Sequence, residues 1–135
     1  MFDHRRRTAI VSNLQNERYV VNALVLAYSL QKHNTYLRQQ GTELVLMVPY
    51  VNDISETSIT RLKTLGWQIR YENDITVPGV ENLLEIHRRN YIKLRVWRWV
   101  EYEKLAWIDA DTLIMGDVSL LLSDKFGTFR QWLVR

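Results

Sequence analysis

Four short runs of mainly apolar residues occur along the chain and predict strands. They read RTAIVS, ELVLMV, WQIRY and KLAWID, and they cover residues 7–12, 43–48, 67–71 and 104–109. Most of these runs are nearly continuously apolar instead of alternating with polar residues, which is typical of parallel strands buried on both faces. The pattern therefore predicts a sheet with layers of other structure on both sides.

The longest apolar stretch predicts a buried helix. The apolar stretch runs from Tyr19 to Leu30. The helix begins near Tyr19, with Asn16 as a possible N-cap, and ends at His33, which we expect to act as a C-terminal cap. The stretch is shorter than the roughly 20 residues that a membrane span requires. Asn22 and Ser29 also interrupt it. We therefore expect a helix of the protein core and no membrane segment.

Two further helices are expected between the later strands. Ser55 can cap a helix that runs to Leu65 and stops at Gly66. Residues 72–81 are typical of a loop, and Asn90 to Glu103 predicts a helix rich in large side chains. Strands that alternate with helices in this way favour an α/β fold of the doubly wound kind.

Composition restricts the class of protein further. The chain has 135 residues, of which 47% are hydrophobic and 24% charged, and this fits a single globular domain over residues 1–135. It has no cysteine, so any metal must use oxygen or imidazole ligands. The N-terminus lacks the apolar core of a signal peptide, and we expect a cytoplasmic protein. A net charge of +3 suggests a mild preference for anionic ligands, and we expect no nucleic-acid partner.

The stretch KLAWIDADTLIMGD, residues 104–117, contains the candidate chemistry. Asp109 ends the last predicted strand and Asp111 follows two positions later. In an extended chain these side chains project from the same face, while Ala110 permits a close approach to the backbone. Two converging carboxylates suit Mn²⁺ or Mg²⁺, which fills its remaining positions with phosphate oxygens and water. At the carboxyl end of a parallel strand, the pair predicts a site for a nucleotide diphosphate.

A D-x-D pair alone arises often by chance, and other interpretations stay open. Either aspartate could simply cap the loop that follows the strand. A phosphatase of the haloacid dehalogenase type also has a strand that ends in D-x-D, with the first aspartate as nucleophile. That pattern places Thr or Val four residues after the first aspartate, where this chain has Leu113, and it places the strand near the start of the chain. The residues on either side of the aspartate pair favour neither the loop cap nor the phosphatase.

Those flanks resemble glycosyltransferase family 8, the glycogenin-like group of retaining transferases with the GT-A fold. ERYVVNALVLAYSLQKHNT, residues 17–35, is similar to the first helix of that family, and residues 91–122 are similar to its central segment. The central segment is the more specific one, because it joins a basic residue, an aromatic helix and the IDADTLIMGDV block. The resemblance implies a GT-A type, Rossmann-like, mostly parallel sheet with flanking helices. It also implies a metal-dependent transfer, with retention, of a hexosyl group from a UDP-sugar to an acceptor hydroxyl.

The resemblance further implies which residues hold the nucleoside. It places Val11, Ser12 and Asn13 around the base and Tyr19 against the uracil. The competing interpretation of Tyr19 is a tyrosine of the core, where aromatic side chains bury a large apolar area.

The diphosphate and metal residues are implied in the same way. Lys93 matches the basic residue of the family at the sugar nucleotide, Asp111 would bind Mn²⁺ (or Mg²⁺) directly, and Asp109 would share the metal and the ribose side. Ala110 would contribute its backbone. Arg89 lies four residues before Lys93 on one predicted helical face, where like charges are mildly unfavourable unless an anion bridges them.

The chain departs from the family pattern after the aspartate block. The family continues with acceptor-binding strands and a late histidine that completes the metal shell, whereas His4, His33 and His87 all precede the aspartates. We therefore expect a domain truncated at its C-terminus, with a third metal ligand missing and no residue that we can assign as nucleophile. The alternative function is a truncated, non-catalytic nucleotide-sugar-binding or interaction module. A Golgi location is the alternative if the chain is a fragment of a longer precursor.

An incomplete sheet would leave apolar surface uncovered, so a homo-oligomer is a further expectation. The side chains that suggest it are Trp97, Trp99, Trp107 and Trp132. The identity of the sugar, and whether the acceptor is a glycan, a protein or a lipid, are left open by the sequence.

Overall fold

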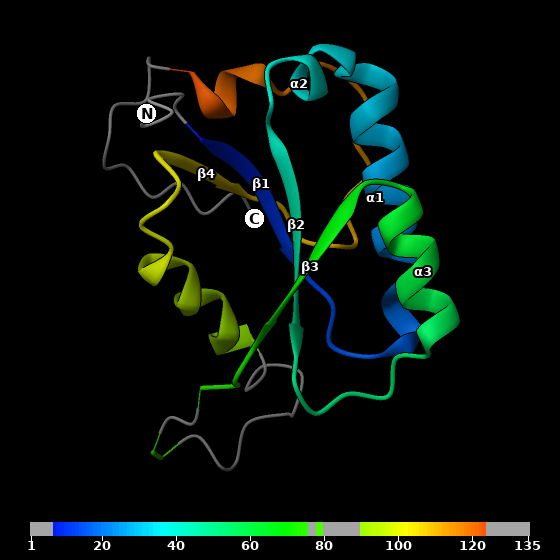
Figure 1. Cartoon of the computed structure of the whole chain (residues 1–135), viewed down its shortest axis with the longest axis vertical. Helices are drawn as coiled ribbons and strands as arrows, with labels where there is room; N and C mark the ends of the chain where they lie inside the picture. The colour runs from blue at the N-terminus through cyan, green and yellow to red at the C-terminus, as the bar shows by residue number, and fades with distance from the viewer. Residues whose placement is uncertain (1–6, 76–77, 80–89, 124–135) are drawn as a thin grey trace, which may run out of the picture.

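A parallel sheet of four strands forms the centre of the computed structural model, which describes residues 7–75, 78–79 and 90–123 (Figure 1). Its strands, in spatial order, are β3 (Trp67–Glu72), β2 (Glu43–Pro49), β1 (Thr8–Asn13) and β4 (Lys104–Trp107). The predicted α/β class and the parallel sheet are confirmed. The predictions that involve Arg89, His4, His87 and Trp132 lie outside the described residues.

The strand order reverses at β1. The chain moves from β1 to β2 on one side and later places β4 on the other, with Val11 of β1 opposite both Val45 and Trp107. In open α/β sheets, ligands bind outside the carboxyl ends of the strands at such a reversal. The carboxyl ends of β1 and β4 therefore define the first place to look for a site.

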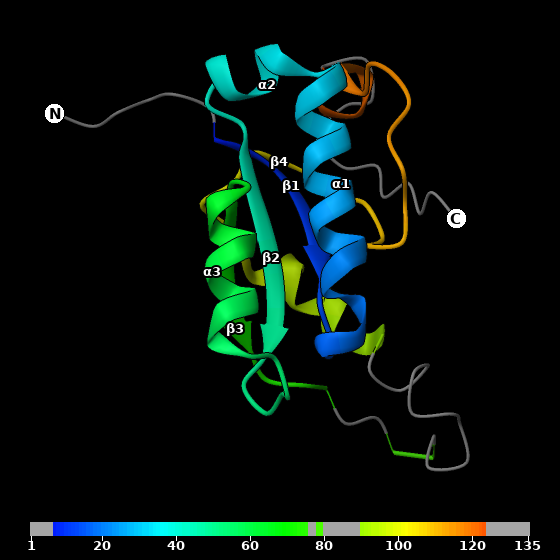
Figure 2. The ribbon, with the colours of Figure 1, turned by 90° about the vertical axis from the view of Figure 1, so that its right-hand side faces the viewer.

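Helices cover the two faces of the sheet (Figure 2). One face carries a short 3₁₀ helix, η1 (Glu17–Tyr19), followed by α1 (Val20–His33), α2 (Thr35–Gln39) and α3 (Glu56–Thr64). The other face carries η2 (Asn90–Arg98), and a last 3₁₀ turn, η3 (Ser119–Leu122), lies beside the end of α1.

Each covered face has its own core, which explains why the strands are apolar at almost every position. On the face of α1 and α3, Ile10 and Leu46 pack with helix residues such as Leu26. On the face of η2, Val11 and Met47 and their neighbours pack against Ile92 and Trp99. Alternate residues of one strand thus serve different cores, as the pleat requires.

The cap of α3 is confirmed. The Ser55 hydroxyl accepts a hydrogen bond from the backbone N–H of Ser58 at 3.2 Å, which satisfies one of the N–H groups that a helix start leaves without a partner. Gly66 follows the helix with a φ of 105°, a left-handed conformation that glycine adopts at low cost. This residue turns the chain from α3 into β3.

Other predicted boundaries were wrong. The segment from Asn90 forms a 3₁₀ helix that ends at Arg98, not a longer helix to Glu103. The strand that was expected to reach Asp109 ends at Trp107. Neither α2 nor η3 was predicted, because each is only about one turn long and has too few residues to show a period.

The two capping predictions for the first helix were also wrong. Asn16 precedes η1, not α1, and its side chain makes no capping hydrogen bond. His33 is the last residue of α1 and is exposed, while the C-cap position belongs to the buried Asn34. The side chain of Asn34 instead reaches a distant segment of the chain.

The tryptophans differ in their exposure. Trp99 is buried against the sheet and Trp107 is half-buried, so neither presents a fully uncovered apolar surface. Trp97 is exposed. No helix in the described part of the chain combines the length and the apolar character that crossing a bilayer requires.

Candidate functional site

The two aspartates lie in a turn directly after β4. The backbone N–H of Ile108 still bonds to the carbonyl of Val11 at 2.9 Å, and the N–H of Thr112 then returns to the carbonyl of Asp109 at 3.1 Å. Ala110 and Asp111 are therefore the central residues of the turn. The prediction that both carboxylates project from an extended strand was wrong, because the ladder with β1 ends before Asp109.

One of the two carboxylates is oriented by a neighbour. The indole Nε1–H of Trp107 donates a hydrogen bond to Oδ1 of Asp109 at 2.8 Å. Both aspartates are exposed, and the side chain of Asp111 makes no hydrogen bond to any residue that the structure describes. The turn thus presents one fixed and one unengaged carboxylate at the carboxyl edge.

This arrangement can accommodate a hard divalent cation. Mn²⁺ and Mg²⁺ are held by one or two carboxylates together with oxygens of the substrate and water, and metal-binding carboxylates are commonly oriented by a further hydrogen bond of the Trp107–Asp109 kind. Within residues 7–75, 78–79 and 90–123 there is no group of three His, Asp or Glu side chains that could hold a metal. The aspartates can therefore contribute part of a coordination shell, with the other positions open to phosphate oxygens.

The end of β1 lies next to this turn. Val11 and Ser12 are buried, and Asn13 is half-buried. Val11 packs in the core beneath η2, so only its backbone can approach a ligand, and its carbonyl is already bonded to Ile108. Ser12 is different, because its hydroxyl has no partner among the described residues.

A second buried polar atom, also without a hydrogen-bond partner in the described part of the chain, follows Ser12 in the loop to η1. It is Oδ1 of Asn16, which sequence reasoning treated as a helix cap. Buried polar atoms are almost always hydrogen-bonded, since leaving one without a partner costs free energy. The signal that could have identified Asn16 is its place in a polar loop at the carboxyl end of a buried strand.

Tyr19 ends η1 and is half-buried. Its ring packs against the core beneath α1, which supports the interpretation as a core tyrosine for part of the ring and leaves the rest accessible. The exposed part of the Tyr19 ring is accessible to a ligand.

The loop that carries Tyr19 is fixed to the start of α3 by Glu17. The backbone N–H of Glu17 donates to Oδ1 of Asp53 at 2.8 Å. Its carboxylate accepts from the Ser58 hydroxyl at 2.5 Å and from the Ser55 N–H at 3.1 Å. The Ser58 hydroxyl, and next the Ser55 N–H, hold the pKa of Glu17 below its ordinary value. These bonds stabilise the loop between β1 and α1.

Lys93 lies in the first half of η2 and is half-buried. Its ammonium group makes no hydrogen bond or ion pair within the described residues. Along the chain, η2 lies between β3 and β4, and it runs from the carboxyl edge of the sheet toward the start of β4 (Figure 1). Its first residues therefore lie toward the carboxyl edge. Lys93 thus lies on the same face as Trp107, which packs against the η2 core.

Polar side chains near the end of α1 fasten the segment that follows the aspartate turn. The Ser29 hydroxyl accepts from the N–H of Ile114 at 3.1 Å. The buried Asn34 donates to the carbonyl of Gly116 at 3.0 Å and accepts from the N–H of Val118 at 2.8 Å. The segment from Ile114 to Val118 is therefore anchored to a rigid helix.

A tyrosine and an aspartate extend this anchor. The Tyr36 hydroxyl donates to Asp117, and Asp117 also accepts from the N–H of Ser119 at 2.7 Å. The Tyr36 hydroxyl, and next the Ser119 N–H, lower the pKa of Asp117. Burial, and next the hydrogen bond to Asp117, raise the pKa of Tyr36. Near neutral pH these shifts favour a protonated Tyr36 hydroxyl, which can donate, and an ionised Asp117 carboxylate, which can accept.

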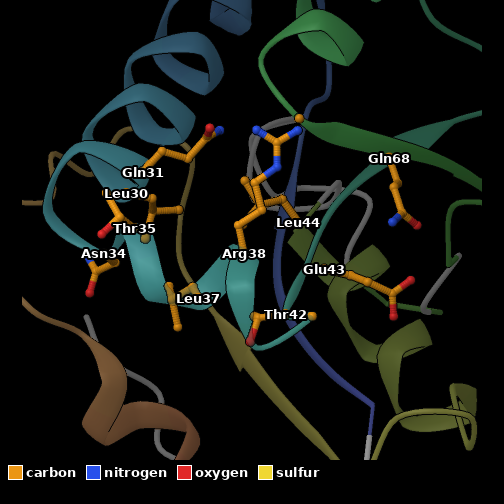
Figure 3. Close-up of a pocket in the computed structure, with 12 residues that line it drawn as sticks. Leu30, Gln31, Asn34, Thr35, Leu37, Arg38, Thr42, Glu43, Leu44 and Gln68 are labelled. Carbon is orange, nitrogen blue, oxygen red and sulfur yellow. The ribbon is translucent and has the colours of Figure 1, made fainter. Parts of the chain in front are cut away.

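A pocket of about 450 Å³ lies at the opposite edge of the sheet (Figure 3). The apolar side chains of Leu30, Leu37 and Leu44 line it, and Gln31 and Arg38 project on the same side of it. It adjoins the ends of α1 and α2 and the starts of β2 and β3. The pocket contains none of the predicted donor residues, so the candidate chemistry does not coincide with it.

Solved structures identify the class of fold. A structure described as the bifunctional glycosyltransferase WbbM matches 87% of this chain and 21% of its own chain, with a TM-score of 0.58 and 17% identity. The galactosyltransferase LgtC, solved in complex with donor and acceptor sugar analogs, matches 84% of this chain and 41% of its own, with a TM-score of 0.57 and 13% identity. The chain therefore has the GT-A fold of these glycosyltransferases.

The family follows from the sequence itself. The model of glycosyl transferase family 8 matches residues 10–129, and the chain belongs to this family. UDP-glucuronate:xylan alpha-glucuronosyltransferase 2 of Arabidopsis thaliana is 33% identical over 117 residues, which are 86% of this chain and 18% of that protein. Glycogenin-1 of Oryctolagus cuniculus is 32% identical over 119 residues, which are 82% of this chain and 32% of that protein. The chain thus spans about a fifth of the length of the xylan glucuronosyltransferases that it matches.

Proposed function

We propose that this chain forms the donor-binding part of a glycosyltransferase, which transfers a hexosyl group from a UDP-sugar to an acceptor hydroxyl. The observation that carries the proposal is the exposed turn with Asp109 and Asp111, which lies where the strand order reverses and beside the end of β1. Two buried polar atoms in β1 and in the loop after it have no hydrogen-bond partner among the described residues. Membership of glycosyltransferase family 8 supports the same reaction.

Asp109 and Asp111 are proposed to hold Mn²⁺ or Mg²⁺. When it is bound, the cation stabilises the negative charge that develops on the diphosphate as the glycosidic bond breaks. The Trp107 indole keeps the Asp109 carboxylate in one orientation, so less ordering is needed when the cation arrives. Ala110, at the centre of the turn, offers backbone next to the donor without a bulky side chain.

The remaining donor contacts are assigned to the end of β1 and to η2. Ser12, Asn13 and Asn16 are proposed to bond the base and ribose, and Tyr19 to pack on the uracil. Val11 would contribute only its backbone, because its side chain is buried in the core.

Lys93 is proposed to bind the diphosphate. A fixed cation placed where charge grows in the transition state stabilises that state more than the ground state. Retention of the anomeric configuration is proposed from the family resemblance alone, and we assign no nucleophile. The acceptor hydroxyl would attack from the face that the diphosphate leaves.

Thermal unfolding with UDP, with Mn²⁺ and with both ligands tests this proposal. At 100 times its dissociation constant, a ligand that binds only the native state stabilises it by about 2.7 kcal/mol, which is a clear shift of Tm for a domain of this size. We expect the shift with UDP and Mn²⁺ together, and we expect it to disappear in Asp111→Asn. That change keeps the shape of the side chain and removes its charge.

The matched control is Asp74→Asn, which changes an exposed aspartate in the loop after β3. It should keep the full shift. A folded wild-type chain that UDP and Mn²⁺ together fail to stabilise would contradict the proposal. A shift with no transfer or hydrolysis of a UDP-sugar would instead favour a nucleotide-sugar-binding module without catalysis.

A further inference from the structure

Two exposed tyrosines stack on one another at the carboxyl edge of the sheet. Tyr50 follows β2 and Tyr71 lies near the end of β3. Their ring centroids are 5.9 Å apart with an angle of 22° between the planes, and 64% of Tyr50 and 41% of Tyr71 are exposed to solvent. Aromatic side chains usually bury most of their surface, so an exposed and ordered pair indicates an interaction site.

The pair lies on the same edge as the candidate donor site. Asn13 is opposite Met47, Met47 is opposite Arg70, and Tyr71 is the next residue along β3. Across the sheet, perpendicular to the strands, β3 lies three strand spacings from β4, and each spacing is about 4.8 Å. A chain of a few sugar units extends over this width, whereas a single sugar at the aspartate turn does not reach the tyrosines.

The backbone around the pair is held in place. The N–H of Tyr50 donates to the carbonyl of Glu72 at 3.3 Å, which joins the two segments that carry the rings. The carboxylate of Glu72 accepts from the Trp99 indole at 3.1 Å, and Arg70 lies 3.4 Å from the same oxygen. Both rings are therefore presented from anchored segments.

The loop after Tyr50 is ordered by a side chain of its own. Asn52 donates to the carbonyl of Pro49 at 2.8 Å and accepts from the N–H of Ile54 at 2.9 Å. A surface that is ordered before its ligand arrives has less conformational freedom to lose on binding.

The chemistry of the surface suits an uncharged, polyhydroxylated ligand. The outer faces of the rings are flat and apolar, and they match the C–H faces of a pyranose, while the phenol groups can bond to sugar hydroxyls. The positively charged residue next to Tyr71 in β3 is Arg70. Its guanidinium lies 3.9 Å from the centre of the Trp99 ring and pairs with Glu101, so it is engaged on the other face of the sheet. Arg70 therefore does not place an unpaired positive charge beside the two rings.

We propose that Tyr50 and Tyr71 bind a glycan, as a surface for the sugar units of the acceptor that lie away from the reacting hydroxyl. This inference rests on the proposed function, because it takes the carboxyl edge as the place of transfer. It specifies the acceptor as an oligosaccharide or polysaccharide in place of a lipid or an isolated hydroxyl of a protein.

Saturation-transfer NMR of the whole chain with β-1,4-linked xylohexaose and α-1,4-linked maltohexaose tests the proposal. We expect at least one of them to bind, and Tyr71→Ala and Tyr50→Ala each to weaken it about tenfold, the cost of losing an aromatic stacking contact. Tyr71→Phe keeps the ring and should retain most of the affinity. The matched control is Tyr28→Ala, which removes a tyrosine of α1 that is 60% exposed.

Thermal stabilisation by UDP with Mn²⁺, measured on the same samples, separates this proposal from the donor function. Tyrosine-dependent glycan binding without an effect of UDP would support the surface and contradict the donor site. A response to UDP with no glycan binding, or with binding that the alanine variants leave unchanged, would overturn the surface. It would also be overturned if Tyr71→Ala abolished self-association of a chain that binds neither glycan, because a second copy would then be the occupant.

Discussion

At the scale of single residues, Ser29 connects the core helix with the segment that follows the aspartate turn. Its hydroxyl donates to the carbonyl of Leu26 at 3.1 Å and accepts from the N–H of Ile114 at 3.1 Å, and the residue is buried. In Ser29→Ala the Ile114 N–H loses its partner where water has little access. We expect the free energy of unfolding to fall by about 1–3 kcal/mol.

Urea unfolding of Ser29→Ala and Thr60→Ala measures this effect. Thr60 also donates its hydroxyl to a carbonyl of its own helix, Glu56 at 3.0 Å, but it is exposed and its hydroxyl accepts no bond from another described segment. The change at Thr60 should stay within about 0.5 kcal/mol. Equal losses in the two variants would show that the bond to Ile114 contributes nothing.

The sequence alone shows the candidate donor residues only by their type and their order along the chain. It identified Asp109 and Asp111 by their spacing, but their presentation depends on where the ladder with β1 ends, which no local pattern specifies. Asn16 shows the same limit, because only the folded structure shows that its Oδ1 is buried and has no partner within residues 7–75, 78–79 and 90–123. Tyr50 and Tyr71 are 21 positions apart, and only the pairing of β2 with β3 brings them together.

At the scale of elements, the strands were predictable because burial on both faces forces an apolar run. The helix after residue 90 was not. Ile92, Val96 and Trp99 contact the core at the spacing of an α-helix, while the exposed Leu94 and Trp97 repeat every third position as in a 3₁₀ helix. Nine residues cannot separate a period of 3.0 from one of 3.6.

The contact between η1 and α3 predicts a dependence of stability on pH. Hydrogen bonds from the Ser58 hydroxyl and the Ser55 N–H favour the ionised form of Glu17 and lower its pKa from the ordinary value of 4.5. Their contribution is therefore present above pH 4.5 and is lost as the pH falls through the lowered pKa of the folded state.

Urea unfolding of wild type and Glu17→Gln between about pH 3 and pH 6 checks this dependence. The variant should be less stable near pH 6 and should lose less stability on acidification. Glu56→Gln, which changes an exposed glutamate in the first turn of α3, should follow the wild-type profile. Parallel pH profiles for wild type and Glu17→Gln would exclude the carboxylate as the source.

At the scale of the whole molecule, two cores fix the sheet and leave its two edges with different roles. The carboxyl edge presents the aspartate turn, the polar atoms of the β1–η1 loop and the stacked tyrosines. The opposite edge has a pocket of about 450 Å³, next to Arg38 and Leu44, that contains none of the candidate donor residues (Figure 3). The proposed donor site therefore follows from the position of charged and polar groups and not from the position of this pocket.

Mapping of amide NMR shifts during a titration with UDP and Mg²⁺, a diamagnetic substitute for Mn²⁺, tests this location most directly. We expect shifts at residues 11–19 and 107–112 and around Lys93, and no change around Arg38 and Leu44. The shifts should require both ligands together. Shifts centred on the opposite edge, or none in a folded chain at millimolar UDP, would contradict the assignment of the carboxyl edge as the donor site.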